Sequence, residues 1–189
     1  MSTPRKVVIL GAAGRDFHTF NTLYRGDPTD RVVAFTAAQI PDIDHRRYPA
    51  SLPGPGYPEG IAIVPEAKRE ALCAAHGVDE VVFAYSDVPY ATVRRASAIA
   101  MAHLADLRLV GDPRTRLRAK RPVISVCATR TGSGKSQTTR DLAKLLRDRA
   151  KRVLVVRHPM PYGDLAAQAV HRFAERADLD RHGCTLEED

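Results

Sequence analysis

Residues 6–21, KVVILGAAGRDFHTFN, decide the fold class of this chain. They open with KVVIL, an apolar and β-branched run that is typical of a strand buried on both faces of a parallel sheet. Gly11 and Gly14 then predict a tight turn that leads into a helix. Strand, glycine turn and helix in this order indicate the first unit of a Rossmann-like α/β fold.

The alternation of strands and helices continues along the next hundred or so residues. Continuous apolar strands that alternate with helices indicate a doubly wound parallel sheet, so we expect residues 1–120 to form a Rossmann-like N-terminal domain. Gly77 is expected to end one helix and Pro89 to open another. The expected strands are 31–36, 61–64, 80–85 and 107–110, and the expected helices are 66–76 and 89–104.

A second strand–loop–helix unit occupies residues 122–150, PVISVCATRTGSGKSQTTRDLAKLLRDRA. Residues 123–127 predict a buried strand, and leucines at helical spacing follow Lys135 and Ser136. This is the layout of a P-loop, whose glycines let several backbone N–H groups point at one phosphate chain. The lysine would neutralise the outer phosphates, and the serine hydroxyl would bind Mg²⁺. A surface Gly-Ser turn with an unrelated lysine is the alternative.

The loop departs from the common pattern G-x-x-x-x-G-K-[ST], because Thr129 stands where the first glycine is expected. It resembles more closely the K-G-G-x-G-K-[ST] loop of the dimeric ATPases related to the nitrogenase iron protein and MinD. Arg130 stands in place of their first cation, and the resemblance implies a homodimer in which Arg130 reaches the partner's nucleotide. A contact with its own nucleotide, or exposure to solvent, is the alternative. The residues expected to bind ATP or GTP are Thr131, Gly132, Ser133, Gly134, Lys135, Ser136 and Gln137.

A further strand is expected at residues 152–156, directly before Arg157. Because ligands bind at the carboxyl ends of parallel strands, this segment should share an edge with the P-loop. A plain turn is the alternative. The residues expected to act in catalysis are Lys135, Arg130 and Arg157, and those expected to bind Mg²⁺ are Ser136 and Asp164. Residues 121–189 are accordingly expected to form an incomplete P-loop nucleotide-binding domain.

The first glycine turn and the proline-rich loop at 41–60 are candidate sites for a second ligand. The second strand ends without the acidic residue that binds a nucleotide ribose, which weakens the case for a dinucleotide. Polar residues at the first helix and arginines in the loop suit a phosphate or a carboxylate. Ordinary helix packing and a solvated loop are the alternatives. The expected substrate-binding residues are Gly11, Gly14, Arg15, Asp16, His18, Arg46 and Arg47, with Tyr48 and Tyr57 as walls.

The chain is basic, with a net charge of +7 and a pI near 9.6. Its cations are spread out without interleaved aromatic residues, which argues against nucleic acid and favours a small phosphorylated metabolite. No apolar run reaches the ~20 residues that cross a membrane, and the N-terminus enters a strand without a visible signal peptide. Three separated cysteines indicate reduced thiols in a cytoplasm, with Cys127 as a small core residue.

Several long segments carry a resemblance to a known family: LGAAGRDFHTFN, VVAFTAAQIP, RRYP, YPEGI, DEVVFAYSDV, VRHPMPYGDL and DRHGCT. They resemble the archaeal cyclic 2,3-diphosphoglycerate synthetases and their bacterial relatives, often described as GTPases. The resemblance implies an ATP-dependent ligase that closes 2,3-bisphosphoglycerate into an internal pyrophosphate. It also implies a fragment, because family members are considerably longer and carry a later acidic, Walker B-type strand. A non-catalytic nucleotide- or metabolite-binding module is the alternative.

Overall fold

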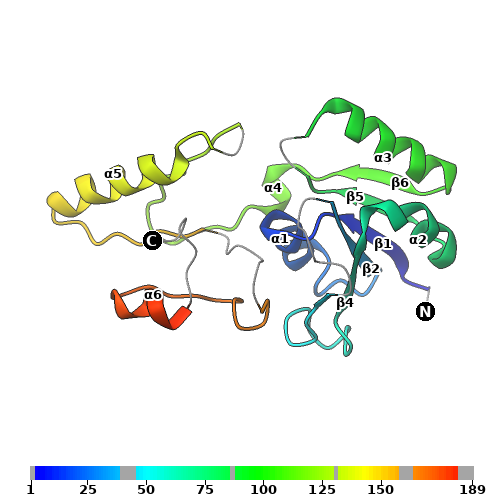
Figure 1. The fold of residues 1–189 in the computed structure, drawn as a ribbon, viewed down its shortest axis with the longest axis horizontal. Coiled ribbons are helices and arrows are strands. Elements are labelled where there is room, and N and C mark those ends of the chain that lie inside the picture. The colour runs from blue at the N-terminus through cyan, green and yellow to red at the C-terminus, as the bar shows by residue number, and fades with distance from the viewer. Residues whose placement is uncertain (1–2, 39–45, 86–87, 130–131, 158–163, 183–189) are drawn as a thin grey trace.

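The computed structural model describes residues 3–38, 46–85, 88–129, 132–157 and 164–182. Within them, six strands form one sheet in the order β3-β4-β2-β1-β5-β6 (Figure 1). Neighbouring strands pair in parallel, except that β3 is antiparallel to β4. The strands are β1 (Arg5–Leu10), β2 (Asp30–Ala37), β3 (Arg47–Tyr48), β4 (Ile61–Pro65), β5 (Glu80–Phe83) and β6 (Asp106–Leu109).

Helices cover both faces of the sheet. The helices of the described residues are α1 (Gly14–Leu23), the 3-10 turn η1 (Glu66–Lys68), α2 (Arg69–His76), α3 (Tyr90–Ala102), α4 (Asp112–Thr115), α5 (Lys135–Asp148) and α6 (Ala177–His182). Helix α1 contributes Phe17 and Phe20 to a core on one face, whereas α2 and α3 contribute Cys73, Ala96 and Ala100 to a core on the other. Among the described residues, no helix is long and apolar enough to cross a membrane.

Strand β1 lies between these two cores and confirms the strand expected at its position. Val7 and Ile9 belong to the core under α1, Val8 and Leu10 belong to the core under α2 and α3, and all four are fully buried. Successive side chains of a strand point to opposite faces, so a continuous apolar run needs a covering layer on each face.

The other elements expected before residue 110 are confirmed, with shifted ends. The expected strands correspond to β2, β4, β5 and β6, and the expected helices to η1 with α2 and to α3. Gly77 ends α2 in the left-handed conformation, with a φ of 57°. The chain order reverses at β1, with β2 and β4 on one side and β5 and β6 on the other. In open α/β sheets, ligands bind at the carboxyl ends of the strands that flank such a reversal.

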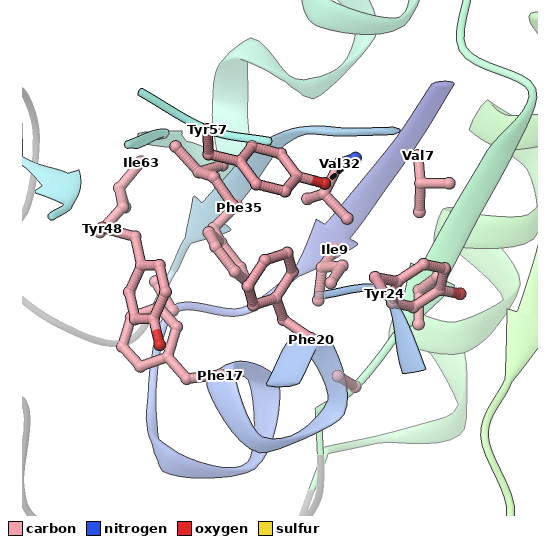
Figure 2. Packing of buried hydrophobic residues seen from close by; sticks show 14 of the residues in the cluster. Val7, Ile9, Phe17, Phe20, Tyr24, Val32, Phe35, Tyr48, Tyr57 and Ile63 are labelled. Atoms are coloured by element: carbon pink, nitrogen blue, oxygen red, sulfur yellow. Dashed lines mark hydrogen bonds between the residues drawn. The ribbon is translucent and has the colours of Figure 1, made fainter. Parts of the chain in front are cut away.

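Aromatic side chains dominate the core under α1, as Figure 2 shows. Phe20 is fully buried, and its ring meets those of Phe35, Tyr48 and Tyr57 edge-on at centroid distances of 5.8, 5.7 and 5.5 Å. The backbone N–H of Val32 donates to the Tyr57 hydroxyl at 3.1 Å. The prediction that the two tyrosines wall a ligand site is therefore wrong, because burying their rings stabilises the fold more than exposing them would.

The proline-rich segment also holds a strand that the sequence did not predict. β3 pairs Arg47 with Ala62 and Tyr48 with Ile61, so the sheet is mixed rather than wholly parallel. Proline is tolerated beside an edge strand because one side of such a strand needs no ladder hydrogen bonds. Strand β3 has only two residues, so no periodic pattern marks it in the sequence.

The two strands expected beyond residue 120 are wrong for the part of the chain that the structure describes. Residues 123–127 and 152–156 form no strand there, and Ile124 and Leu154 are 61% and 83% exposed. Cys127 is exposed as well, so its expected place in a core is also wrong. A strand needs a neighbour to complete its backbone hydrogen bonds, and the sheet ends at β6. The helix expected after the glycine loop is confirmed as α5, which lies apart from the sheet in Figure 1.

Candidate functional site

The loop before α5 has the backbone of a phosphate-binding turn. Gly132 and Gly134 are left-handed, with φ of 76° and 78°, and Gly134 directly precedes the helix. A Cβ added at either position would meet nothing within 4 Å, so these glycines serve the backbone conformation rather than a close approach. Lys135 and Ser136 begin the helix, where the direction of the backbone N–H groups and the helix dipole favour an anion.

The charge of the first turn of α5, like its backbone, favours the binding of a phosphate chain. It contains no acidic residue, and Lys135 is half-buried there whereas Ser133 and Ser136 are exposed. The Gln137 side-chain amide donates to the Asp141 carboxylate at 3.2 and 3.3 Å, one turn along the helix. A lysine and backbone N–H donors in a turn that contains no acidic residue can hold the phosphates of a Mg-nucleotide.

Asp164, the second residue expected to bind Mg²⁺, accepts backbone hydrogen bonds. Its Oδ1 accepts from the N–H groups of Ala166 and Ala167 at 2.8 and 3.2 Å, which shapes a turn. Among the described residues, no group of three or more His, Cys, Asp or Glu side chains is placed to hold a metal ion. The pairing of Asp164 with Ser136 around Mg²⁺ stays a prediction.

The expected nucleotide site includes three other residues, Arg157, Arg130 and Thr131. Arg157 is exposed and lies outside the described helices and strands. Arg130 and Thr131 lie outside the described residues. Their expected roles in transferring or binding phosphate stay predictions.

The turn between β1 and α1 is built around a buried carboxyl group. Asp16 is 4% exposed, and its Oδ2 accepts from the Ala13 N–H at 2.8 Å. A Cβ added at Gly11, whose φ is 115°, would lie 2.3 Å from the Asp16 Cγ. Burial raises the pKa of Asp16 to about 7. The carboxyl group thus takes a donor that a bound anion would use, and the expected substrate role of Gly11, Gly14 and Asp16 stays a prediction.

Arg15 and His18 were also expected at this site, and the structure places them differently: one is exposed and the other contacts α4. His18 hydrogen-bonds through Nε2 to the carbonyl oxygen of Thr115 at 2.7 Å, which ties α1 to α4. Arg15 is exposed on α1. The polar residues at the start of α1 therefore include one that holds two helices together.

The two arginines of the proline-rich loop stabilise that loop. Arg47 donates from Nε to the Glu59 carbonyl at 2.7 Å and from Nη2 to the Gly60 carbonyl at 3.3 Å. The Arg46 carbonyl accepts from the Ile63 N–H at 3.0 Å. These contacts give Arg47 a structural task, and its expected contact with a ligand stays a prediction.

Sequence reasoning missed a polar cluster at the carboxyl ends of β2, β4 and β5. Glu66 Oε2 accepts from the hydroxyl groups of Tyr85 and, at 3.2 Å, Thr36, and its Oε1 pairs with Arg69 Nη1 at 2.6 Å. Burial, and then the hydrogen bond to Glu66, raise the pKa of Tyr85. The signal in the sequence was the position of Glu66 directly after an expected strand, at the edge where ligands bind.

A cavity of about 490 Å³ lies at this edge. Its walls come from the residue that follows β2, from η1 and α2, and from α3 between Ala91 and Ile99. Its lining includes four charged side chains, Glu66, Arg69, Glu70 and Arg95, together with Thr92 and Ile99. Residues of α2 and α3 belong to the same core on one face of the sheet, and the cavity lies where both helices meet the carboxyl edge of that face.

The opposite, amino edge of the sheet also carries charges, but they are paired with one another. The Tyr24 hydroxyl donates to Glu80 Oε1 at 2.7 Å, and Arg108 Nη1 lies 3.2 Å from the same oxygen. Arg5 pairs with Asp30 at 2.9 Å. These ion pairs join the first residues of β1, β2 and β5 and serve the fold.

The chain is similar to a curated synthetase. Arginine synthetase ArcE of Thermococcus kodakarensis is 51% identical over 184 residues, which cover 97% of this chain and 41% of the relative. The chain thus spans about two fifths of the length of the relative that it matches.

No family model matches the chain. Among solved structures, UDP-D-quinovosamine 4-dehydrogenase from Vibrio fischeri resembles it with a TM-score of 0.42 and 17% identity, over 58% of this chain and 80% of that chain. The strand order, rather than this weak similarity, defines the α/β fold.

Proposed function

We propose that this chain carries the nucleotide-binding loop and a substrate-binding surface of an ATP-dependent synthetase. The observation that carries the proposal is the pair of left-handed glycines directly before Lys135 and Ser136 at the start of α5. The name of the arginine synthetase relative supports the same class of reaction. Because the chain spans 41% of that relative, the activity is proposed for the protein as a whole.

The residues of the loop have distinct tasks in this proposal. The N–H groups of residues 132–137 hold the phosphates of ATP, Lys135 neutralises the outer ones, and Ser136 with Asp164 holds Mg²⁺. Bound ATP supplies the phosphoryl group that activates the second substrate. Arg157 and Arg130 stabilise the negative charge of the transfer, with Arg130 acting across a homodimer. GTP is the alternative nucleotide.

The second substrate distinguishes two versions of the proposal. The resemblance to cyclic 2,3-diphosphoglycerate synthetases favours a phosphorylated metabolite, whereas the name of the relative favours an amino acid. The identity of 51% extends along nearly the whole chain, so we give the amino acid precedence. The cluster at Glu66, Arg69 and Tyr85 supports this choice, because it places a carboxylate where a bisphosphate would be repelled.

Calorimetric titration of the full chain with Mg-ATP and Mg-GTP tests the nucleotide site. Lys135→Ala should weaken the binding of the preferred nucleotide about tenfold or more, since a charge-assisted contact contributes about 1.5–3 kcal/mol. Lys144→Ala is the matched control, because Lys144 is an exposed lysine further along the same helix. Equal affinity in the two variants, or no binding by the unaltered chain, would overturn the assignment.

A further inference from the structure

We propose that the cavity between η1, α2 and α3 binds the amino-acid end of a small zwitterion, with its carboxylate and its ammonium group recognised together. The cavity lies at the carboxyl edge of the sheet, because Ala38 follows β2 and Glu66 follows β4. Its volume of about 490 Å³ suits a small molecule. This inference takes the identity of the ligand, an amino acid, from the proposed function.

Arg69 supplies the strongest argument for a bound carboxylate. The residue is 5% exposed and lines the cavity, and its Nη1 pairs with Glu66. Its Nε is buried and has no hydrogen-bond partner among the described residues. A buried guanidinium N–H without an acceptor is costly and rare in folded proteins, so Arg69 calls for an acceptor beyond the described residues, a place that a bound ligand would fill. A carboxylate oxygen is the acceptor that guanidinium groups pair with best.

The second cation of the cavity lies near the start of a helix. Arg95 is an exposed residue of α3, and Ala91 and Thr92 in the first turn of α3 line the same cavity. This turn carries no acidic residue and no side-chain cap. The Thr92 N–H donates to the Pro89 carbonyl at 2.9 Å, so it is the helix dipole that adds to the attraction that Arg95 exerts on a carboxylate.

Two carboxylates in the lining of the cavity favour a zwitterion over a ligand that carries only negative charge. Glu66 and Glu70 line the cavity together with the two arginines, so the charged groups of the lining balance. Glu66 is held in place by Thr36, Tyr85 and Arg69. A multiply phosphorylated ligand would be repelled by these carboxylates, whereas an ammonium group would be attracted to them. The lining thus matches a ligand with both signs of charge.

Titration of the full chain with L-arginine, followed by calorimetry, tests this site. Arg95→Ala should weaken arginine binding about tenfold. Arg94→Ala is the matched control, because Arg94 is an exposed residue of the same helix that does not line the cavity. Glu70→Gln should also weaken binding, and agmatine, which lacks the carboxylate, should bind at least tenfold more weakly than arginine to the unaltered chain.

Other outcomes overturn the proposal. The site is not a zwitterion site if arginine fails to bind at millimolar concentration, if Arg94→Ala and Arg95→Ala bind it equally, or if agmatine binds as well as arginine. Tighter binding of 2,3-bisphosphoglycerate that is lost in Arg95→Ala would make it an anion site instead. Titrating Lys135→Ala with both Mg-ATP and arginine separates the two proposals. Loss of Mg-ATP binding in this variant tests the P-loop, whereas its affinity for arginine should be unchanged.

Discussion

The sheet of residues 3–115 and the segment from residue 116 to residue 182 use similar sequence patterns with different results. The run at residues 6–10 becomes the buried central strand β1, whereas the equally apolar run at 123–127 is exposed and forms no strand among the described residues. Helix α1 buries two phenylalanines, and α5 buries no residue. An apolar, β-branched run therefore gives a tendency toward a strand, and the presence of neighbouring strands and helices decides the outcome.

The largest expected effect is a difference in unfolding free energy between a substitution in the sheet and one in the segment beyond residue 116. Phe20→Ala removes a fully buried ring and should lower the free energy of unfolding by about 3–5 kcal/mol. Leu154→Ala, at a residue that is 83% exposed, should change it by less than about 0.5 kcal/mol. Urea unfolding followed by circular dichroism measures both. Similar losses in the two variants would show that the segment beyond the sheet is packed as tightly as the sheet.

A pH dependence should arise from Asp16 in the sheet region. Its pKa is raised to about 7 in the folded chain from the ordinary 3.8, so the folded state binds this proton more tightly than the unfolded state. The resulting stabilisation is present at low pH and is lost as the pH rises through the folded pKa. Relative to Asp16→Asn, the unaltered chain should lose about 2–3 kcal/mol of unfolding free energy between pH 5 and pH 7.5.

The comparison with Asp16→Asn cancels the titration of the remaining groups. Urea unfolding of both proteins at several pH values measures the difference. A difference that stays constant across this range would contradict the burial of an uncharged Asp16 carboxyl group.

The smallest effect is expected at Gly132, in a comparison of two left-handed glycines, one from each region. Gly11→Ala should cost about 1–3 kcal/mol from its backbone conformation, and more from the contact of the new Cβ with Asp16. Gly132→Ala meets no neighbour within 4 Å, so its cost should be limited to the conformation of the loop itself. Thermal unfolding of the two variants gives the order. A larger loss of stability in Gly132→Ala would place that loop in a packed environment.

Much of the sheet could be predicted from the sequence, because each parallel strand carries its own apolar run. Gly77 marks the end of α2 by a local requirement for the left-handed conformation. β3 could not be predicted, since two residues carry no periodicity and their pairing with β4 depends on the return of a proline-rich loop. The glycine loop and α5 could be predicted from local sequence. The strands expected on either side of them do not form among the described residues, because a strand needs neighbouring strands, and the described sheet ends at β6.

Two local units follow from the amino-acid sequence alone: the strand–turn–helix at residues 6–21, and the two glycines that let the chain enter α5 at Lys135. These depend on side-chain spacing and on backbone freedom, which are properties of a short stretch. The meeting of Glu66, Arg69 and Tyr85 at one edge of the sheet depends on the folded chain as a whole, and so does the burial of Asp16. Burial and hydrogen-bond partners come from residues distant in the chain, and neither is encoded in the spacing of any single segment.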